Sequence, residues 1–286
     1  MQCLVSVVMA LALVEMVYAH SSVAGGASDH APGSGPSAIP NEQVFDLPLR
    51  SGEQQRVLYV APDHPKAVIV MLPGGAGNVG IERHGNLRHD DNFVVRTRSL
   101  WVNRGYAVLI PDALDGDNLR GLRSSPEYAA LVEDLVAFVH TKSVGRVFLL
   151  GTSQGSIAAM NGAAHLAADQ LAGVVLTESV SRLGGSHETV FQAHPQDVRV
   201  PALVVANRDD HCDVAPPGDA PCIASAMSHA ASVRVLYVTG GIDRSHKACG
   251  SLTPHGYYGI EAQVVGDIAD WMDRVRPGPA LHAVQR

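Results

Sequence analysis

The chain has 286 residues, enough for one large domain with a full hydrophobic core, although two small domains would also fit. Hydrophobic residues make up 46% of the chain and charged residues 17%, as in an ordinary folded globular protein. The formal net charge of -7 argues against nucleic acid or an anionic membrane surface as the main partner, because both are bound through basic surfaces.

The first segment, residues 1–19, has the pattern of a secretory signal peptide. Residues 4–14 form an apolar run and Val17-Tyr18-Ala19 offers a cleavage site, although no Lys or Arg precedes the run. The alternatives are a buried helix and a wrongly chosen start codon. The run is too short to span a membrane comfortably, and no later segment resembles a membrane span. Residues 20–43 begin with a Ser-, Gly-, Ala- and Pro-rich stretch, which predicts a flexible linker. We therefore expect a secreted or periplasmic protein with a single folded domain over residues 44–286.

The remaining chain alternates strand-like and helix-like segments. A continuous apolar, β-branched run at 67–72 is typical of a strand buried on both faces of a parallel sheet. The segment 93–104 predicts one helix, and 126–141 predicts an amphipathic helix with Ser125 as its N-cap and Pro126 at its first position. Further strands are expected at 44–49, 56–61, 106–111, 146–150, 172–176, 202–206 and 233–238, and further helices at 153–167 and 261–274. This order predicts an α/β fold with a mostly parallel sheet of about eight strands, helices on both faces and right-handed crossovers.

A candidate nucleophile lies between a strand and a helix of this pattern. The stretch Gly151-Thr152-Ser153-Gln154-Gly155 has the form Gly-x-Ser-x-Gly and follows the predicted strand at 146–150 directly. A tight, strained turn of this kind needs small neighbours, and it holds the serine hydroxyl at a helix N-terminus, where developing negative charge is favoured. An N-capping serine is the alternative, but the strand before and the helix after favour a catalytic Ser153.

On these features the chain resembles the α/β-hydrolase superfamily, over about residues 44 to 275. Within it, the chain looks like the small bacterial serine hydrolases that lack a large cap domain. The resemblance implies a serine, acid and histidine in that order along the sequence, acting through an acyl-enzyme, with no metal or organic cofactor.

The resemblance also implies an oxyanion hole made of backbone N–H groups. One donor is expected from Gln154, the residue after the nucleophile. The second is expected from Pro73-Gly74-Gly75-Ala76-Gly77, where relatives often have His-Gly-Gly, and either Gly75 or Gly74 is the candidate. A phosphate-binding loop is the alternative, but no Gly-Lys-Ser/Thr follows.

The acid is expected after the strand at 202–206, where relatives often show Gly-x-x-Asp. Asn207 takes the Gly position, which makes Asp210 the candidate acid, with Asp209 and then Asp213 as alternatives. The base is expected in the loop after the strand at 233–238.

Two histidines of that loop are candidates for the base, His255 and His246. His255 lies in a Gly-rich stretch just before the last helix, where relatives commonly carry the histidine, and this position favours it over His246.

The cysteines of the chain bear on this same region. Beyond Cys3 in the first segment there are three, and an odd number in an exported chain predicts one disulfide and one free thiol. A Cys212–Cys249 bridge would tie the acid loop to the histidine loop. The alternatives are a Cys212–Cys222 bridge and no disulfide at all. No Cys-x-x-Cys pair occurs, so a zinc site is not expected.

The sequence therefore predicts hydrolysis of a carboxylic ester or related acyl compound by Ser153, Asp210 and His255. Acyl transfer, lactone opening and cofactor-free perhydrolysis by the same groups stay open, as does a non-catalytic binding protein on this fold. The expected partner is a small-molecule acyl substrate, with no stable membrane insertion, and the oligomeric state is open. Arg96 and Arg98 are candidates for binding a substrate carboxylate, with a solvated helix surface as the favoured alternative.

Overall fold

The computed structural model describes residues 42–143 and 145–275. The predicted signal sequence, and the predicted linker up to residue 41, lie outside the described residues. The strands are β1 (Glu42–Pro48), β2 (Gln54–Val60), β3 (Ala67–Leu72), β4 (Tyr106–Pro111), β5 (Arg146–Thr152), β6 (Gly173–Thr177), β7 (Ala202–Asn207) and β8 (Val233–Val238). The α-helices are α1 (Phe93–Arg96), α2 (Arg98–Asn103), α3 (Pro126–Lys142), α4 (Gln154–His165), α5 (Ala220–Ala226) and α6 (Glu261–Arg274). Five single-turn 3₁₀ helices are η1 (Leu114–Gly116), η2 (Val190–Gln192), η3 (Pro195–Asp197), η4 (Pro217–Asp219) and η5 (Pro254–Gly256).

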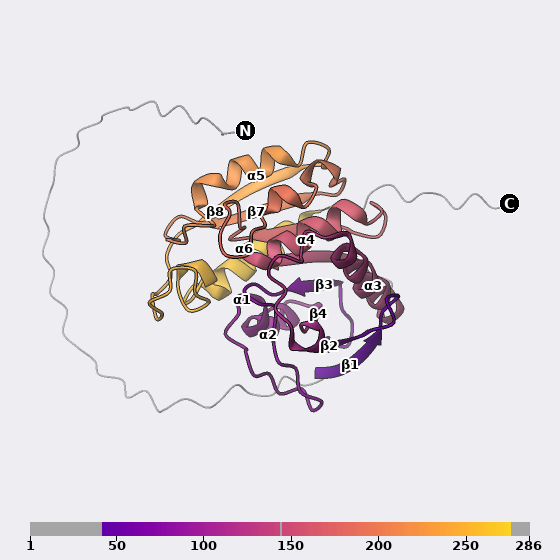
Figure 1. Ribbon diagram of the computed structural model, residues 1–286. Helices are drawn as coiled ribbons and strands as arrows, with labels where there is room; N and C mark the ends of the chain where they lie inside the picture. Colours follow the sequence, from indigo (N-terminus) through magenta and orange to yellow (C-terminus); the bar gives the residue numbers. More distant parts are fainter. Residues whose placement is uncertain (1–41, 144, 276–286) are drawn as a thin grey trace, which may run out of the picture. The chain divides into compact units, whose positions relative to one another are not determined.

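The strands form one sheet in the order β1-β2-β4-β3-β5-β6-β7-β8, and Figure 1 labels β1 to β4 in one part of it and β7 and β8 in another. β2 runs antiparallel to both β1 and β4, and every other neighbouring pair is parallel. The mostly parallel sheet of about eight strands predicted from the sequence is therefore confirmed. None of the helices in the described ranges is long and apolar enough to cross a membrane.

Helices cover both faces of the sheet, each face with its own hydrophobic core. One core joins the sheet to α3, α4 and α5, and the other joins it to α1, α2 and α6. The central strand β3 shows why both are needed, because its side chains alternate between the two faces and all six are fully buried. Val68, Val70 and Leu72 belong to the first core, and Ala67, Ile69 and Met71 to the second.

The helical segment predicted at 93–104 is confirmed in its extent, but it is broken into α1 and α2 at Thr97. The Thr97 hydroxyl donates a hydrogen bond of 2.7 Å to the carbonyl of Phe93, four residues earlier. A threonine hydroxyl that bonds a carbonyl of its own helix competes with the backbone N–H groups for that carbonyl and bends the helix. The cap predicted for the next helix is confirmed, since the Ser125 side chain accepts a hydrogen bond from the N–H of Tyr128 and Pro126 begins α3.

The carboxyl ends of the parallel strands carry the polar residues of interest. Ser153 follows β5, Glu178 follows β6 and Asp210 comes three residues after β7. The long segment after β8 leads to His255, before α6. In open parallel sheets this edge is where ligands bind, because loops from neighbouring strands meet there.

Candidate active site

The turn between β5 and α4 holds Ser153 in a strained conformation. Its φ of 53° and ψ of -122° lie outside the regions that side-chain-bearing residues normally adopt. Glycines on either side make the turn possible. A Cβ on Gly151 would lie 2.1 Å from the carbonyl oxygen of Gly155, and one on Gly155 would lie 2.0 Å from that of Leu72. The Gly-x-Ser-x-Gly pattern is therefore required by close backbone packing.

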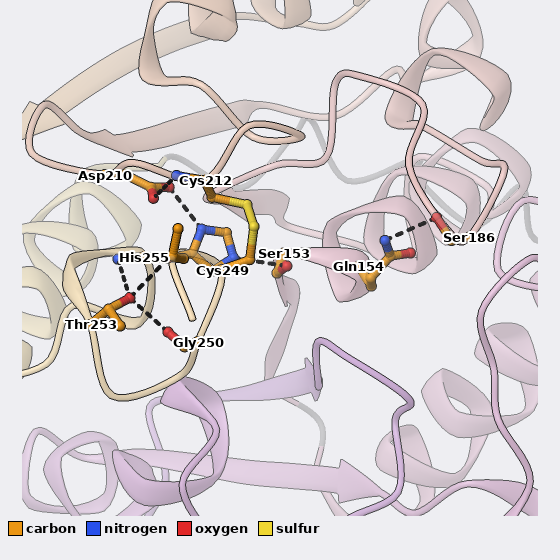
Figure 2. Close-up of a disulfide and its surroundings, with 10 residues drawn as sticks. Ser153, Gln154, Ser186, Asp210, Cys212, Cys249, Gly250, Thr253 and His255 are labelled. Atoms are coloured by element: carbon orange, nitrogen blue, oxygen red, sulfur yellow. Dashed lines mark hydrogen bonds and ion pairs between the residues drawn. A yellow bond between two sulfur atoms is a disulfide. The ribbon is translucent and has the colours of Figure 1, made fainter. Parts of the chain in front are cut away.

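Ser153, His255 and Asp210 form a hydrogen-bonded chain, drawn in Figure 2. Ser153 Oγ lies 2.9 Å from His255 Nε2, and His255 Nδ1 lies 2.7 Å from Asp210 Oδ2. The side chains of His255 and Asp210 are 4% and 0% exposed, so water does not compete for this pair. With Nδ1–H donating to the carboxylate, Nε2 is left as the acceptor for the serine hydroxyl proton. This is the arrangement a serine nucleophile needs.

The alternative acids and base lie elsewhere. Asp209 is exposed, and its Oδ2 accepts a hydrogen bond of 2.6 Å from the N–H of Gly240. Asp213 and His246 are exposed as well. Of the five residues that the sequence offered as acid or base, the structure brings only Asp210 and His255 to Ser153.

Local hydrogen bonds hold the acid and the histidine in place. Asp210 Oδ1 accepts a hydrogen bond of 2.8 Å from the N–H of Cys212, which leaves Oδ2 for the imidazole. The N–H of His255 donates to Thr253 Oγ1, the N-cap of η5. Asn207, at the end of β7, donates from Nδ2 to the carbonyls of Gly240 and Pro254. This buried amide therefore ties the end of the acid's strand to the segment carrying the base.

A disulfide joins the same two loops. Cys212, two residues after Asp210, is bonded to Cys249, six residues before His255, as Figure 2 shows. The predicted bridge is confirmed, and the alternative Cys212–Cys222 pairing is wrong. Cys249 also lines the cleft beside Ser153, so the bridge forms part of the wall of the site.

The glycine loop after β3 packs directly against the serine. A Cβ on Gly74 would lie 2.8 Å from the Thr152 carbonyl oxygen and 3.1 Å from Ser153 Cβ, so only glycine allows this approach. Gly75 has φ +60° and lines the cleft, and no hydrogen bond joins its N–H to another described residue. Gln154 begins α4, so its N–H has no partner within the helix. The N–H groups of Gly75 and Gln154 are thus available to a ligand oxygen.

The cleft at Ser153 has a volume of about 260 Å³. Its lining combines apolar side chains, such as Val79 and Phe93, with polar and charged ones from the segment 88–92. Asp112, directly after β4, fixes part of this wall. Its carboxylate accepts hydrogen bonds from three consecutive backbone N–H groups, those of residues 79–81.

Arg96 and Arg98 do not line the cleft at Ser153. Arg96 pairs with Glu261 and donates to the carbonyl of Gly256, next to His255. Arg98 pairs with Glu42, and its side chain is only 11% exposed. The structure therefore shows internal ion pairs in place of the two roles considered from the sequence, carboxylate binding and a solvated surface. The hydrogen bond of Arg96 to Gly256 also supports the histidine loop.

A buried carboxyl beside the acid was missed in the sequence. Glu178 is 1% exposed, and burial, reinforced by the charge of Asp210, raises the pKa of its carboxyl well above the ordinary value. One oxygen of Glu178, one of Asp210 and one ring nitrogen of His255 lie within 4.8 Å of one another. The sequence does hold one signal that could have found Glu178. It comes directly after β6, the neighbour of the nucleophile's strand β5, at the edge of the sheet where ligands bind.

This group is also the one cluster of metal-ligand side chains among the described residues. The short contact between His255 Nδ1 and Asp210 Oδ2 uses the atoms that a cation would need, so the arrangement fits a proton-sharing chain better than a metal site.

No family model matches the chain, and no curated protein matches it in sequence. Solved structures match across most of its length. Est1E from Butyrivibrio proteoclasticus is 14% identical, with a TM-score of 0.52, covering 80% of this chain and 97% of its own. A dienelactone hydrolase from Anabaena variabilis is 16% identical, with a TM-score of 0.56, covering 82% and 99%. An α/β serine hydrolase without a lid, from Xanthomonas campestris, is 11% identical, with a TM-score of 0.55, covering 86% and 100%. At these identities the likeness concerns the fold.

Proposed function

We propose that this chain, which has the α/β-hydrolase fold, is a serine hydrolase that cleaves a carboxylic ester or a related acyl compound. One observation carries the proposal: a strained serine at the wall of a cleft, 2.9 Å from an imidazole nitrogen whose other nitrogen lies 2.7 Å from a buried carboxylate. Such a chain activates a hydroxyl that is otherwise a poor nucleophile.

In the proposed reaction, Ser153 Oγ attacks the acyl carbon while His255 Nε2 takes the hydroxyl proton. The Asp210 carboxylate stabilises the imidazolium that forms, and the backbone N–H groups of Gly75 and Gln154 donate to the oxyanion. The imidazolium then gives its proton to the leaving alcohol, which leaves an acyl-enzyme on Ser153. Water attacks this ester with the same base, and free Ser153 and the carboxylic acid result.

The surroundings of the site favour a substrate that is not fully enclosed. Where a cap would be inserted, between β6 and β7, the segment carries only the single-turn helices η2 and η3. Acyl transfer, lactone opening and perhydrolysis use the same three groups, and product analysis with water, alcohols or peroxide as the attacking molecule separates them.

Ser153→Ala tests the proposal. Hydrolysis of esters of graded acyl length should fall by about 10³-fold or more, because only binding and oxyanion effects are left. A fluorophosphonate probe should label the wild-type protein at Ser153 and leave the variant unlabelled. Ser225→Ala, an exposed serine in α5, is the matched control and should keep both activity and labelling. A folded Ser153→Ala protein with near-normal turnover would remove the proposal, and an unlabelled wild type would favour a binding protein.

We also propose that the protein is exported. The support is the apolar run at residues 4–14 and the Cys212–Cys249 disulfide, a bond that persists mainly in oxidising compartments. Mass spectrometry of the exported protein should find an N-terminus near His20. A protein that keeps Met1 would exclude export by cleavage.

A further inference from the structure

Glu178 is buried beside Asp210 and His255 and is held there through both its backbone and its side chain. It has a φ of 43°, an unusual conformation for a residue with a side chain. Its N–H donates to the carbonyl of Val205, and its Oε1 accepts a hydrogen bond of 2.7 Å from the N–H of Asn207. Its Oε2 is buried and accepts no hydrogen bond from a described residue. One carboxyl oxygen is therefore fixed by the backbone of β7, and the other is unsatisfied unless it carries a proton.

The titratable groups that face Glu178 come from two elements. Asp210 approaches from the loop after β7, and His255 and Tyr257 approach from the segment before α6. Burial raises the pKa of Tyr257 well above its ordinary value, so its hydroxyl is neutral, and it donates to the carbonyl of Val205. The same hydroxyl faces Glu178 and lowers the pKa of that carboxyl, but by less than burial and the charge of Asp210 raise it. The imidazole of His255 is already bonded to Asp210. Glu178 thus shares its buried space with a second carboxyl and no permanent cation.

We propose that Glu178 carries a proton in the resting protein and donates it, from Oε2, in a hydrogen bond to Asp210, acting as a positioning residue for the acid. The two carboxyls then hold one negative charge between them. An oxygen of each carboxyl lies within 4.8 Å of the other, and two ionised carboxylates this close and out of water would repel each other strongly. Each Asp210 oxygen already accepts one hydrogen bond, from Cys212 or from His255, and retains a second lone pair for the Glu178 proton.

The proposal rests on the proposed function for its kinetic consequences. Glu178 fixes the rotation of the Asp210 carboxylate, and through it the direction of the His255 ring. Because Glu178 is neutral, it adds no charge beside the imidazole. An ionised Glu178 would stabilise the imidazolium and move the acid limb of the kcat/KM profile to higher pH, since a nearby opposite charge shifts a pKa by about 1–3 units.

Two variants separate the neutral from the ionised state. Glu178→Gln keeps a neutral donor in the same shape, and Glu178→Leu keeps the volume but removes the donor. If Glu178 is neutral, the Glu178→Gln variant should retain kcat within about 3-fold and leave the acid limb where it is. The Glu178→Leu variant should lower kcat by roughly 10- to 100-fold with KM nearly constant, as expected for the loss of a hydrogen bond to a charged group.

Two results would overturn the proposal. If Glu178→Gln moves the acid limb down by about one pH unit or more, Glu178 is ionised in the native protein. If Glu178→Leu unfolds more easily but turns over normally, Glu178 serves the fold alone.

Infrared spectroscopy tests the proton without any activity assay, so a failure of the proposed function can be told apart from a failure of this inference. With ¹³C-labelled glutamate, the wild-type protein at neutral pH should show the C=O stretch of a neutral buried carboxylic acid. The band should vanish in Glu178→Gln and shift in Asp210→Asn. Glu188→Gln is the matched control, because this buried carboxylate already accepts hydrogen bonds from Gly121 and Ser124, and the band should survive there. A wild-type protein without the band would refute the proposal even if every variant failed to fold.

Discussion

Removal of the disulfide beside the site should cost both stability and turnover. The bridge closes a loop with a sequence separation of 37, and the chain-entropy relation gives about 4 kcal/mol of stabilisation for a loop of that length at room temperature. In a domain of this size the loss of that amount corresponds to a fall in Tm of roughly 8–16 °C. In urea denaturation, the double variant Cys212→Ala/Cys249→Ala should show this loss of about 4 kcal/mol in the free energy of unfolding.

Turnover should fall as well, for a geometric reason. The bridge ties the backbone two residues from Asp210 to the loop that carries His255, and a displacement of about 1 Å in a catalytic group can cost about 10²-fold in rate. Thr253 and Asn207 still hold the histidine loop in the variant, so we expect a loss of roughly 10- to 100-fold in kcat rather than complete inactivation.

The control is the wild-type protein with its disulfide reduced, which keeps both sulfur atoms. It should match the double variant in stability and rate, because only the covalent bond is lost. A peptide map without reductant must first show the two cysteines in one crosslinked fragment. If they are crosslinked, and the reduced protein keeps its Tm and its kcat, the bridge does not position the acid and the base, and the reasoning fails.

Three further predictions concern single residues of the site and its frame. His255→Ala should lose activity about as severely as removal of the nucleophile, whereas His246→Ala should keep most of it, and kcat/KM on one ester ranks the two. Gly155→Ala should lower the free energy of unfolding, measured by urea titration, by about 1–3 kcal/mol or more, because the new Cβ would lie 2.0 Å from a backbone oxygen. Gly185→Ala is the control and should be near neutral, because a Cβ there would have no neighbour within 4 Å. Glu178 binds its proton more tightly in the folded chain than in the unfolded one, so stability should decline as pH rises from the ordinary glutamate pKa towards the raised one, by up to about 1.4 kcal/mol per pH unit. Glu178→Gln should abolish that slope, and an equal slope in both proteins would argue against a raised pKa.

The sequence by itself determined all the strands and most of the helices, and with them the fold, although the short helix α5 and the break at Thr97 were not predicted. A run such as 67–72, apolar at every position, can be satisfied only between two covered faces, and the alternation of such runs with helices specifies a parallel sheet. The turn at Ser153 was equally legible, because both glycines that it needs lie within two residues of the serine. These signals are local, so each can be recognised before any long-range contact is known.

Only the tertiary structure decided which distant side chains meet. Asp209 and Asp210 are adjacent in sequence, yet one is exposed and the other buried against an imidazole, a difference set by how the chain leaves β7. His255 is brought to Ser153 across 102 residues, while His246, in the same loop, stays at the surface. The register of a long irregular loop depends on contacts from other strands and on a covalent bridge, and none of these is written in its own sequence pattern.

Glu178 shows the same limit for electrostatics. One glutamate after a strand is unremarkable in sequence, and nothing nearby along the chain changes its charge. Its neighbours Asn207, Asp210 and Tyr257 follow about 30 to 80 positions later, and the fold brings them together out of water. Proton affinity is set by burial and by the sum of nearby charges, so this property of the site arises only when the chain is folded.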